Sequence, residues 1–229
     1  MNQPVDLRFD GPLAIISLNS PPLNIFDVAM RDELIGALTA ANDVPAVRVV
    51  VLRSEGKHFS AGADLSEFGT ASSIFEGRRI RWDRDPWVML HELRIPTVVA
   101  LRGTTLGSGF EMSMLCDIRL AAQGTRVGLP ETKLGMLPAA GGTQSLLKAI
   151  GAPQALPIIA LGEPIPAEEA RALSLVHEVC DDVDARAYEV ARQLAAIEPP
   201  VLAATRRLLR VAADEPIELG LATENRVGR

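Results

Sequence analysis

The apolar and polar positions at the start of the chain predict a β-hairpin. Two short segments, Val5–Phe9 and Leu13–Leu18, have the length of strands, and residues 10–12 between them read Asp-Gly-Pro. Gly tolerates the backbone of a tight turn and Pro restricts φ, so this tripeptide is typical of a turn between two strands. We therefore expect the chain to open with two strands joined at residues 10–12.

The next segments predict a helix and then a buried strand. Asp27 can cap a helix that runs to about Asn42, in which Leu34 and Leu38 belong to an apolar stripe at helical spacing. Val47–Leu52 is an apolar and mostly β-branched run, as a strand buried on both faces requires. The order strand, helix, strand is the beginning of an α/β fold.

Two further apolar runs, Thr97–Leu101 and Ile118–Ala122, predict more buried strands. Residues 54–64 read as a loop after the strand that ends at Leu52, and residues 103–109 read as the loop after Thr97–Leu101. A short helix over Phe110–Leu115 follows the second loop. The chain thus repeats the order strand, glycine loop, helix.

Helices are expected in most of the remaining sequence. Residues 70–92 have no clear pattern and are assigned to helices, and the chain beyond Pro138 looks helical apart from a short strand near Val176–Val179. The last fifty residues are rich in Ala and Arg, which favours helices. We therefore divide the chain into an α/β core, residues 1–180, and a short C-terminal helical module, residues 181–229.

Composition and charge exclude several classes of protein. The 229 residues are 48% hydrophobic, which predicts a packed globule, and the net charge of −6 argues against a nucleic-acid or membrane-surface partner. No apolar stretch is long enough to span a bilayer, and the first residues lack the pattern of a secretory signal. We expect a cytoplasmic protein with neither nucleic acid nor membrane as partner.

The cysteines and histidines show no metal-ligand spacing. Cys116 lies in an apolar run and is expected to be a buried reduced thiol, and Cys180 is far from it in the sequence. His58, His91 and His177 are isolated, and each is expected on the surface or in a loop. No metal site is predicted.

Two glycine-containing loops are the candidate ligand-binding segments. Phe59–Leu65 reads Phe-Ser-Ala-Gly-Ala-Asp-Leu, and Gly103–Glu111 reads Gly-Thr-Thr-Leu-Gly-Ser-Gly-Phe-Glu. Each follows a predicted buried strand and leads into a helix, which is where α/β proteins bind ligands. Gly permits unusual dihedrals and close approach, so each loop can aim a backbone N–H at one ligand oxygen and form an oxyanion hole.

The same loops have simpler interpretations. Asp64 with Glu67, and Ser108 with Glu111, match the capping box of a helix N-terminus, and either loop taken singly favours the cap. In the second box Glu111 would accept from the Ser108 N–H that an oxyanion needs, so the two roles exclude each other. The second loop lacks the Lys of a P-loop and the third Gly of a dinucleotide fingerprint, and Leu106 breaks the hydrolase G-x-S-x-G motif.

Two glutamates near these loops are candidates for acid–base chemistry. Glu111 lies in the first turn of the helix that follows the second loop, among apolar residues. Glu131 follows Pro130 just before another short helix. An acid after Pro is by itself typical of a helix N-terminus, so Glu131 alone favours that structural role.

Several short motifs follow one another in order along most of the chain. They are Ser-Pro-Pro-Leu-Asn at 20–24, Lys-His-Phe-Ser-Ala-Gly-Ala-Asp at 57–64, Gly-Ser-Gly-Phe-Glu at 107–111 with Cys-Asp at 116–117, Pro-Glu at 130–131, Gly-Met-Leu-Pro-Ala-Ala-Gly-Gly-Thr-Gln at 135–144, and Pro-Ala-Glu-Glu-Ala at 166–170 with Leu-Val at 175–176. In their order and number these motifs resemble the crotonase, or enoyl-CoA hydratase/isomerase, superfamily.

The resemblance implies a fold, an assembly and a ligand. The implied fold is an α/β spiral of ββα units with a C-terminal helical module, assembled as a homotrimer or a dimer of trimers. The N–H groups of Ala63 and Ser108 would receive the thioester oxygen of an acyl-CoA substrate. The Ala61 carbonyl would lie near the adenine of coenzyme A, whose path would be lined by Ala63, Asp64, Leu65 and Ser66.

The resemblance also implies an activity. Two-glutamate hydratases of the superfamily carry acids at the positions of Glu111 and Glu131, so we expect hydration of a 2-enoyl-CoA thioester to 3-hydroxyacyl-CoA, with Glu111 as base and Glu131 as proton donor. No cofactor is expected, because coenzyme A enters as part of the substrate. Two alternatives are an enoyl-CoA double-bond isomerase that uses Glu131, and a non-catalytic acyl-CoA-binding homologue whose short C-terminus, ending at Arg229, leaves the site open.

Overall fold

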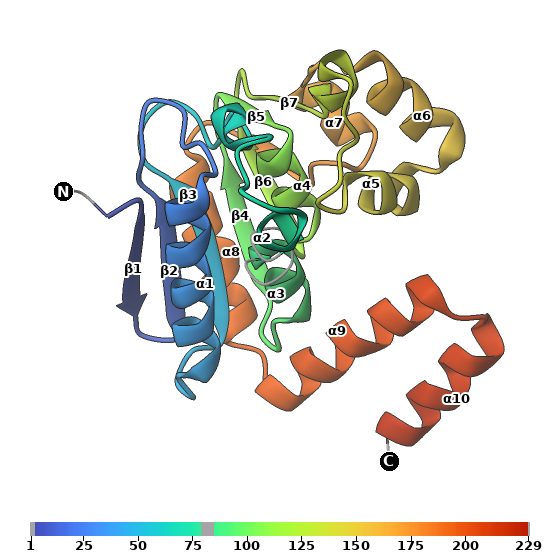
Figure 1. Ribbon diagram of the computed structural model, residues 1–229. Helices are drawn as coiled ribbons and strands as arrows, with labels where there is room; N and C mark the ends of the chain where they lie inside the picture. The colour runs from blue at the N-terminus through green and yellow to red at the C-terminus, as the bar shows by residue number, and fades with distance from the viewer. Residues whose placement is uncertain (1–2, 79–84, 229) are drawn as a thin grey trace.

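The main sheet forms the centre of the molecule. The computed structural model describes residues 3–78 and 85–228 (Figure 1). Within them the main sheet has the strand order β1-β2-β3-β4-β6-β9, with β1 antiparallel to β2 and the other neighbours parallel. Its strands are β1 Val5–Asp10, β2 Leu13–Leu18, β3 Val49–Ser54, β4 Thr97–Leu101, β6 Ile118–Ala122 and β9 Glu178–Cys180. The predicted strands are confirmed, with β3 shifted two residues toward the C-terminus and β9 beginning two residues and ending one residue later than predicted.

A second, smaller sheet was not predicted. It has the strand order β5-β7-β8, with β5 Thr104–Leu106, β7 Arg126–Gly128 and β8 Ile165–Pro166. The assignment of residues 103–109 to a loop was therefore wrong over Thr104–Leu106. Strands of two or three residues are too short to show the alternation on which sequence prediction depends.

Helices surround both sheets. They are α1 Val28–Asp43, α2 Ile74–Arg78, α3 Pro86–Glu92, α4 Ser108–Met114, α5 Gly142–Ile150, α6 Ala152–Leu161, α7 Ala167–Ala172, α8 Val183–Ala195, α9 Pro199–Asp214 and α10 Ile217–Val227, with the 3-10 turns η1 Leu65–Glu67 and η3 Pro130–Leu134. The helices expected within residues 70–92 are confirmed as α2 and α3, while residues 79–84 lie outside the described residues. No helix among the described residues is long and apolar enough to cross a bilayer.

The parallel strands are buried on both faces, as their continuous apolar sequences indicate. Alternate side chains of a strand point to opposite sides of a sheet. In β3, Val50 and Leu52 pack in the core shared with α1, α3 and α4, whereas Val49 and Val51 pack on the other face with α8. Figure 1 shows α1 in front of the sheet and α8 behind it.

Helix α1 begins where the sequence predicts. The Asp27 side chain accepts a hydrogen bond from the Met30 N–H at 2.7 Å, and the helix ends at Asp43. This contact satisfies one of the N–H groups that have no partner inside the helix. Leu34 and Leu38 face the core.

One arginine ties helix α9 to the core. Arg206 is 8% exposed, its Nε lies 2.7 Å from Asp117 Oδ1, and its Nη1 donates to the Leu93 carbonyl. Asp117 also accepts from the N–H and the hydroxyl of Thr97, the first residue of β4. At its far end α9 also pairs with α5, through Asp214 and Lys148, and α9 and α10 together form a helical hairpin beside the rest of the molecule (Figure 1).

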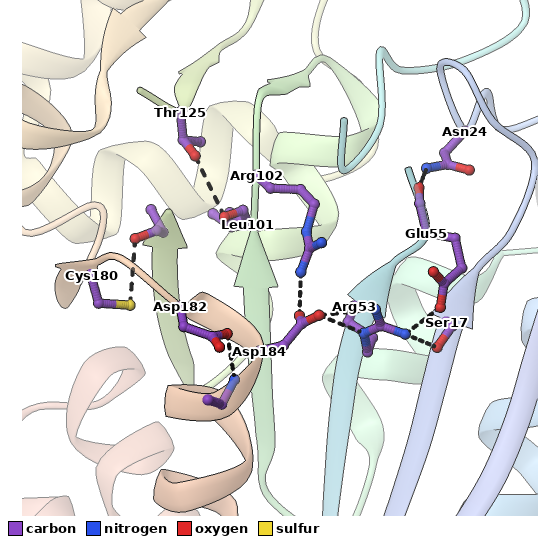
Figure 2. A network of polar contacts seen from close by, with 12 residues as sticks. Ser17, Asn24, Arg53, Glu55, Leu101, Arg102, Thr125, Cys180, Asp182 and Asp184 are labelled. Atoms are coloured by element: carbon purple, nitrogen blue, oxygen red, sulfur yellow. Dashed lines mark hydrogen bonds and ion pairs between the residues drawn. The ribbon is translucent and has the colours of Figure 1, made fainter. Parts of the chain in front are cut away.

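An ion-pair network joins α8 to the ends of two strands (Figure 2). Asp184 is in the first turn of α8. Its Oδ2 lies 2.9 Å from Nη2 of Arg53 in β3, and its Oδ1 pairs with Arg102, which follows β4. Arg53 pairs in addition with Glu55. The two arginine side chains are only 16% and 23% exposed, so Asp184 compensates two charges that water reaches poorly.

The first prediction concerns this network. Asp184→Ala leaves two largely buried guanidinium groups without their shared carboxylate, so the free energy of unfolding should fall by about 2 kcal/mol. Urea denaturation measures the change. Glu189→Ala is the matched control on the same helix, because Glu189 pairs with Arg186 at the surface with 58% exposure and should change the stability little. Equal effects of the two variants would contradict a structural role for the network.

Candidate active site

The two glycine loops lie side by side because their backbones pair. Ser60 and Thr105 form a parallel β-bridge. The Leu106 N–H donates to the Ser60 carbonyl at 3.0 Å, and the Ser60 N–H donates to the Thr104 carbonyl at 3.3 Å. These bonds continue the alignment of β3 and β4, from which the two loops arise. The loops therefore present their next residues, 61–64 and 107–108, at one place.

The backbone around Ala63 is fixed by Phe26. The Phe26 N–H donates to the Gly62 carbonyl at 2.9 Å, and the Phe26 carbonyl accepts from the Asp64 N–H at 3.2 Å. Both bonds flank Ala63, in the pattern of a parallel bridge. Within the described residues the Ala63 N–H donates to no protein acceptor.

Ser108 is the first residue of α4, and its N–H is one of the groups without a partner inside the helix. Gly107 before it has φ 51° and ψ −129°, a backbone that residues with a side chain rarely adopt. A Cβ built on Gly62 would lie 3.7 Å from the Ser108 nitrogen, so the two loops are in close contact at this point. The structure thus brings the predicted donors Ala63 and Ser108 to neighbouring positions.

The first capping box is formed only in part. Asp64 accepts from the Ser66 N–H at 2.8 Å and caps η1, as expected. Glu67 does not return to this turn; its carboxylate accepts from the Val28 N–H at 2.8 Å and pairs with Arg31 at 2.7 Å. The reciprocal half of the predicted box is therefore wrong, because the start of α1 lies within reach of Glu67 and offers unpaired N–H groups.

The second capping box is wrong. Gly107, not Ser108, is the N-cap of α4, and Glu111 is directed elsewhere. Glu111 is 2% exposed, and its Oε1 accepts from the N–H groups of Ala140 and Gly142 at 2.8 and 2.9 Å. Gly142 is the first residue of α5, so the carboxylate lies at a helix N-terminus, where the helix dipole and two donors stabilise its negative form.

Glu131 has the opposite environment. It lies in η3 after Pro130, and burial raises the pKa of its carboxyl above the usual range. Its Oε2 is buried and has no hydrogen-bond partner among the described residues. A Cβ built on Gly107 would lie 2.9 Å from Glu131 Oε1, so only Gly at 107 leaves room for this carboxyl group. Desolvation outweighs a hydrogen bond from the backbone of Glu131 itself, so the neutral form is favoured more than it would be in water.

One cavity of about 500 Å³ unites these groups. Of the residues predicted for the site, those that line it are Ala61, Ala63, Asp64, Leu65, Ser108, Glu111 and Glu131. Ser66 lies beside it, exposed, with its N–H on Asp64. Apolar side chains form much of the remaining wall, among them Trp87, Leu134 and Met136. The cavity thus brings the two candidate acid–base groups, Glu111 and Glu131, together with the two predicted backbone donors and an apolar surface.

Sequence reasoning missed three residues that shape the site. Ala140 and Gly142 hold Glu111, and Trp87 lies in the wall of the cavity. The Gly141-Gly142 pair before a helix could have indicated a close approach of a ligand or side chain. Trp87 gave no usable signal, because the segment around it has no clear periodicity.

His58 and His177 accept hydrogen bonds from the backbone, and Cys116 is buried. Thr104 N–H donates to His58 Nδ1 at 2.9 Å, and Arg119 N–H donates to His177 Nδ1 at 3.0 Å. Cys116 is free and buried, as predicted, and burial raises the pKa of its thiol to about 12, which keeps it neutral. Within residues 3–78 and 85–228, no three His, Cys, Asp or Glu side chains are grouped as a metal site requires.

Comparison with known proteins places the chain among acyl-CoA enzymes. The family model for enoyl-CoA hydratase/isomerase matches residues 8–227. A "probable enoyl-CoA hydratase" of Bacillus subtilis is 36% identical over 194 residues, covering 84% of this chain and 74% of that protein. The 2,3-dehydroadipyl-CoA hydratase of Escherichia coli is 32% identical over 219 residues, covering 93% of this chain and 84% of that protein.

A solved structure shares the whole fold. The crystal structure of an enoyl-CoA hydratase from Bacillus anthracis superposes with a TM-score of 0.92 at 32% identity, and the match covers 98% of this chain and 89% of that one. The α/β spiral with C-terminal helices, expected from the sequence motifs, is thereby confirmed.

The second prediction follows from the raised pKa of Glu131. A carboxyl group with a raised pKa in the folded state stabilises the fold when protonated and lowers the stability as pH rises through its range. Glu131→Gln removes this titration. The free energy of unfolding of the variant, relative to the unsubstituted protein, should therefore increase as the pH rises above the ordinary range of a Glu carboxyl, about pH 4.3. Urea denaturation from below this pH upward measures the difference, and a constant difference would contradict a raised pKa.

Proposed function

Because the chain belongs to the enoyl-CoA hydratase/isomerase family of enzymes, we propose that it adds water across the double bond of a 2-enoyl-CoA thioester to give a 3-hydroxyacyl-CoA. One observation carries the proposal. Glu111 and Glu131 line the same cavity but have opposite environments, one favouring the carboxylate and the other the neutral acid. A hydration needs one group of each kind.

The thioester oxygen lies between the N–H groups of Ala63 and Ser108. Attack of water at the β carbon shifts electron density onto this oxygen, and the resulting enolate is stabilised by two fixed donors. The Ser108 N–H is at the first position of α4, where the helix dipole adds to the attraction. Removing one donor of this kind typically lowers the rate by about 10²–10³.

The two glutamates move the protons. Glu111, as the carboxylate, takes a proton from water while the water oxygen forms the bond to the β carbon. Glu131, as the acid, delivers its proton to the α carbon as the enolate collapses. The product has gained one water, and a proton passed from Glu111 to Glu131, directly or through solvent, restores both groups; such a pair titrates as a unit.

Coenzyme A enters as part of the substrate, and no separate cofactor takes part. Its adenine lies near the Ala61 carbonyl, and its chain runs past Ala63, Asp64, Leu65 and Ser66 toward the cavity. Of these residues only Ser66 is outside the cavity lining, at its rim beside Asp64. The apolar wall around Trp87 and Leu134 receives the acyl group.

The protein forms a homotrimer or a dimer of trimers. Support comes from the C-terminal hairpin, whose apolar side chains lack cover in the single chain. Val201, Leu209 and Ile217 are 58%, 67% and 69% exposed. Apolar side chains at such exposure, gathered on two successive helices, are typical of a surface that packs against another subunit.

The third prediction separates hydratase from isomerase. Gln keeps the size of Glu but exchanges no proton, so Glu111→Gln and Glu131→Gln should each lower kcat for hydration of crotonyl-CoA by about 10²–10⁴. An isomerase can move one proton with a single carboxylate. On a 3-enoyl-CoA, Glu131→Gln should therefore lose isomerisation, while Glu111→Gln retains a trace.

The control for this assay is Glu67→Gln, at the wall of the cavity but bound to Arg31 and the start of α1. It tests whether the loss of any carboxylate charge near the cavity is enough to lower kcat for hydration. Near-normal hydration by Glu111→Gln would contradict the two-glutamate mechanism and favour the isomerase. Tight binding of crotonyl-CoA without turnover by the unsubstituted protein would favour the non-catalytic homologue.

The fourth prediction concerns assembly. Multi-angle light scattering at micromolar concentration should give the mass of three or six chains of 24.5 kDa. Leu209→Lys places a charge on the exposed apolar face of α9 and should shift the mass toward the monomer. A monomer in the unsubstituted protein would contradict the proposed assembly.

A further inference from the structure

Trp87 contacts the second glycine loop at the residue that supplies the oxyanion donor. Its indole Nε1 donates to the Ser108 carbonyl at 2.9 Å, and the residue is 5% exposed. Trp87 is at the second position of α3, after Pro86, and Asp85 caps this helix by accepting from the N–H groups of Trp87 and Val88 at 3.1 and 3.2 Å. The start of a rigid helix thus sets the position of the indole.

The peptide between Gly107 and Ser108 needs such an anchor. Gly restricts its own dihedrals little, so the direction of the Ser108 N–H depends on bonds made on both sides of that peptide. The Gly107 N–H donates to the Gly128 carbonyl at 3.0 Å, and the Gly107 carbonyl, which belongs to the same peptide group as the Ser108 N–H, accepts from the Glu111 N–H at 2.8 Å. The indole holds the following peptide group, through the Ser108 carbonyl.

The same indole is joined to the other oxyanion loop. Its ring packs edge-on against Phe26, with centroids 5.4 Å apart and planes at 63°. Phe26 is the residue whose backbone holds Gly62 and Asp64 on either side of Ala63. One aromatic pair therefore contacts both loops and links the positions of their two donors.

We propose that Trp87 is a positioning residue for catalysis, whose indole N–H fixes the direction of the Ser108 N–H toward the thioester oxygen. The proposal rests on the proposed function, because it requires a thioester carbonyl between Ala63 and Ser108. A buried Trp commonly finds an acceptor for its N–H for packing reasons alone. The role in positioning is distinguished by an effect on the bound carbonyl that loss of packing does not produce.

The test uses Trp87→Phe, which keeps an aromatic ring against Phe26 but loses the donor. We expect kcat for crotonyl-CoA to fall by about 10-fold, part of the ~10²–10³ lost when an oxyanion donor is removed, with a smaller change in KM from the altered wall of the acyl pocket. The direct readout is the infrared carbonyl stretch of bound butyryl-CoA, a saturated thioester that has no double bond to hydrate. Polarisation by two donors lowers this frequency, and the variant should lose about half of the shift.

Two further variants control the experiment. Val88→Ala alters the next residue of α3, which is 52% exposed, and should leave the kinetics and the carbonyl frequency as they are. If Trp87→Phe fails to fold, benzothienylalanine at position 87, introduced by codon suppression, keeps the bicyclic shape and replaces only the N–H by sulfur. The benzothienyl variant should show the same loss of the carbonyl frequency shift as Trp87→Phe.

The outcomes are separable. A carbonyl frequency that is unchanged in Trp87→Phe or in the benzothienyl variant, with butyryl-CoA bound, overturns the positioning role and leaves the proposed function intact. Equal losses of kcat and stability with an unchanged frequency assign Trp87 to packing alone and also overturn it. If butyryl-CoA does not bind the unsubstituted protein, the proposed function fails and the inference fails with it.

Discussion

The backbone pairing of Ser60 with β5 holds the two glycine loops together, and the geometry of the site depends on it. Parallel strands β3 and β4 end at the same edge of the sheet, so the loops that follow them start as neighbours. The bridge from Ser60 to Thr105 extends this pairing beyond the strands and fixes where residues 61–64 and 107–108 lie. The predicted donors, Ala63 and Ser108, are adjacent because the sheet continues into the loops.

The two glutamates show how a fold separates the properties of identical side chains. Glu111 is the more deeply buried, yet the start of α5 supplies two N–H groups that replace the water it loses. For Glu131 burial outweighs a hydrogen bond from its own backbone, and the pKa of its carboxyl rises. The effect of burial on a carboxyl group therefore depends on the donors that accompany it.

Much of this arrangement could be predicted from the sequence, and the rest could not for physical reasons. The strands β1 to β4, the helix capped by Asp27 and the two glycine loops, apart from the strand Thr104–Leu106 within the second, follow from local pattern and turn chemistry. The targets of Glu67 and Glu111 did not, because each carboxylate bonds to a helix start distant in sequence instead of its own turn. The contact between Trp87 and Ser108 likewise joins two segments that only the folded chain brings together. Local motifs predicted a hydrogen-bond partner close in sequence, whereas in the folded chain the partner comes from a distant segment.

The sheet is buried on both faces, and during synthesis on the ribosome one of these faces forms well before the helix that covers it. On the face formed by Leu13, Ile15, Val49, Val51 and Val98, the helix that packs is α8, which ends at Ala195. By the time β6 is complete at Ala122, a ribosome-bound chain has the apolar strands of this face but not the helix that covers it. More than seventy further residues separate the end of β6 from the end of α8. At synthesis rates of about 5–20 residues per second this leaves the face bare for several seconds, an interval in which chaperones or neighbouring nascent chains compete for it.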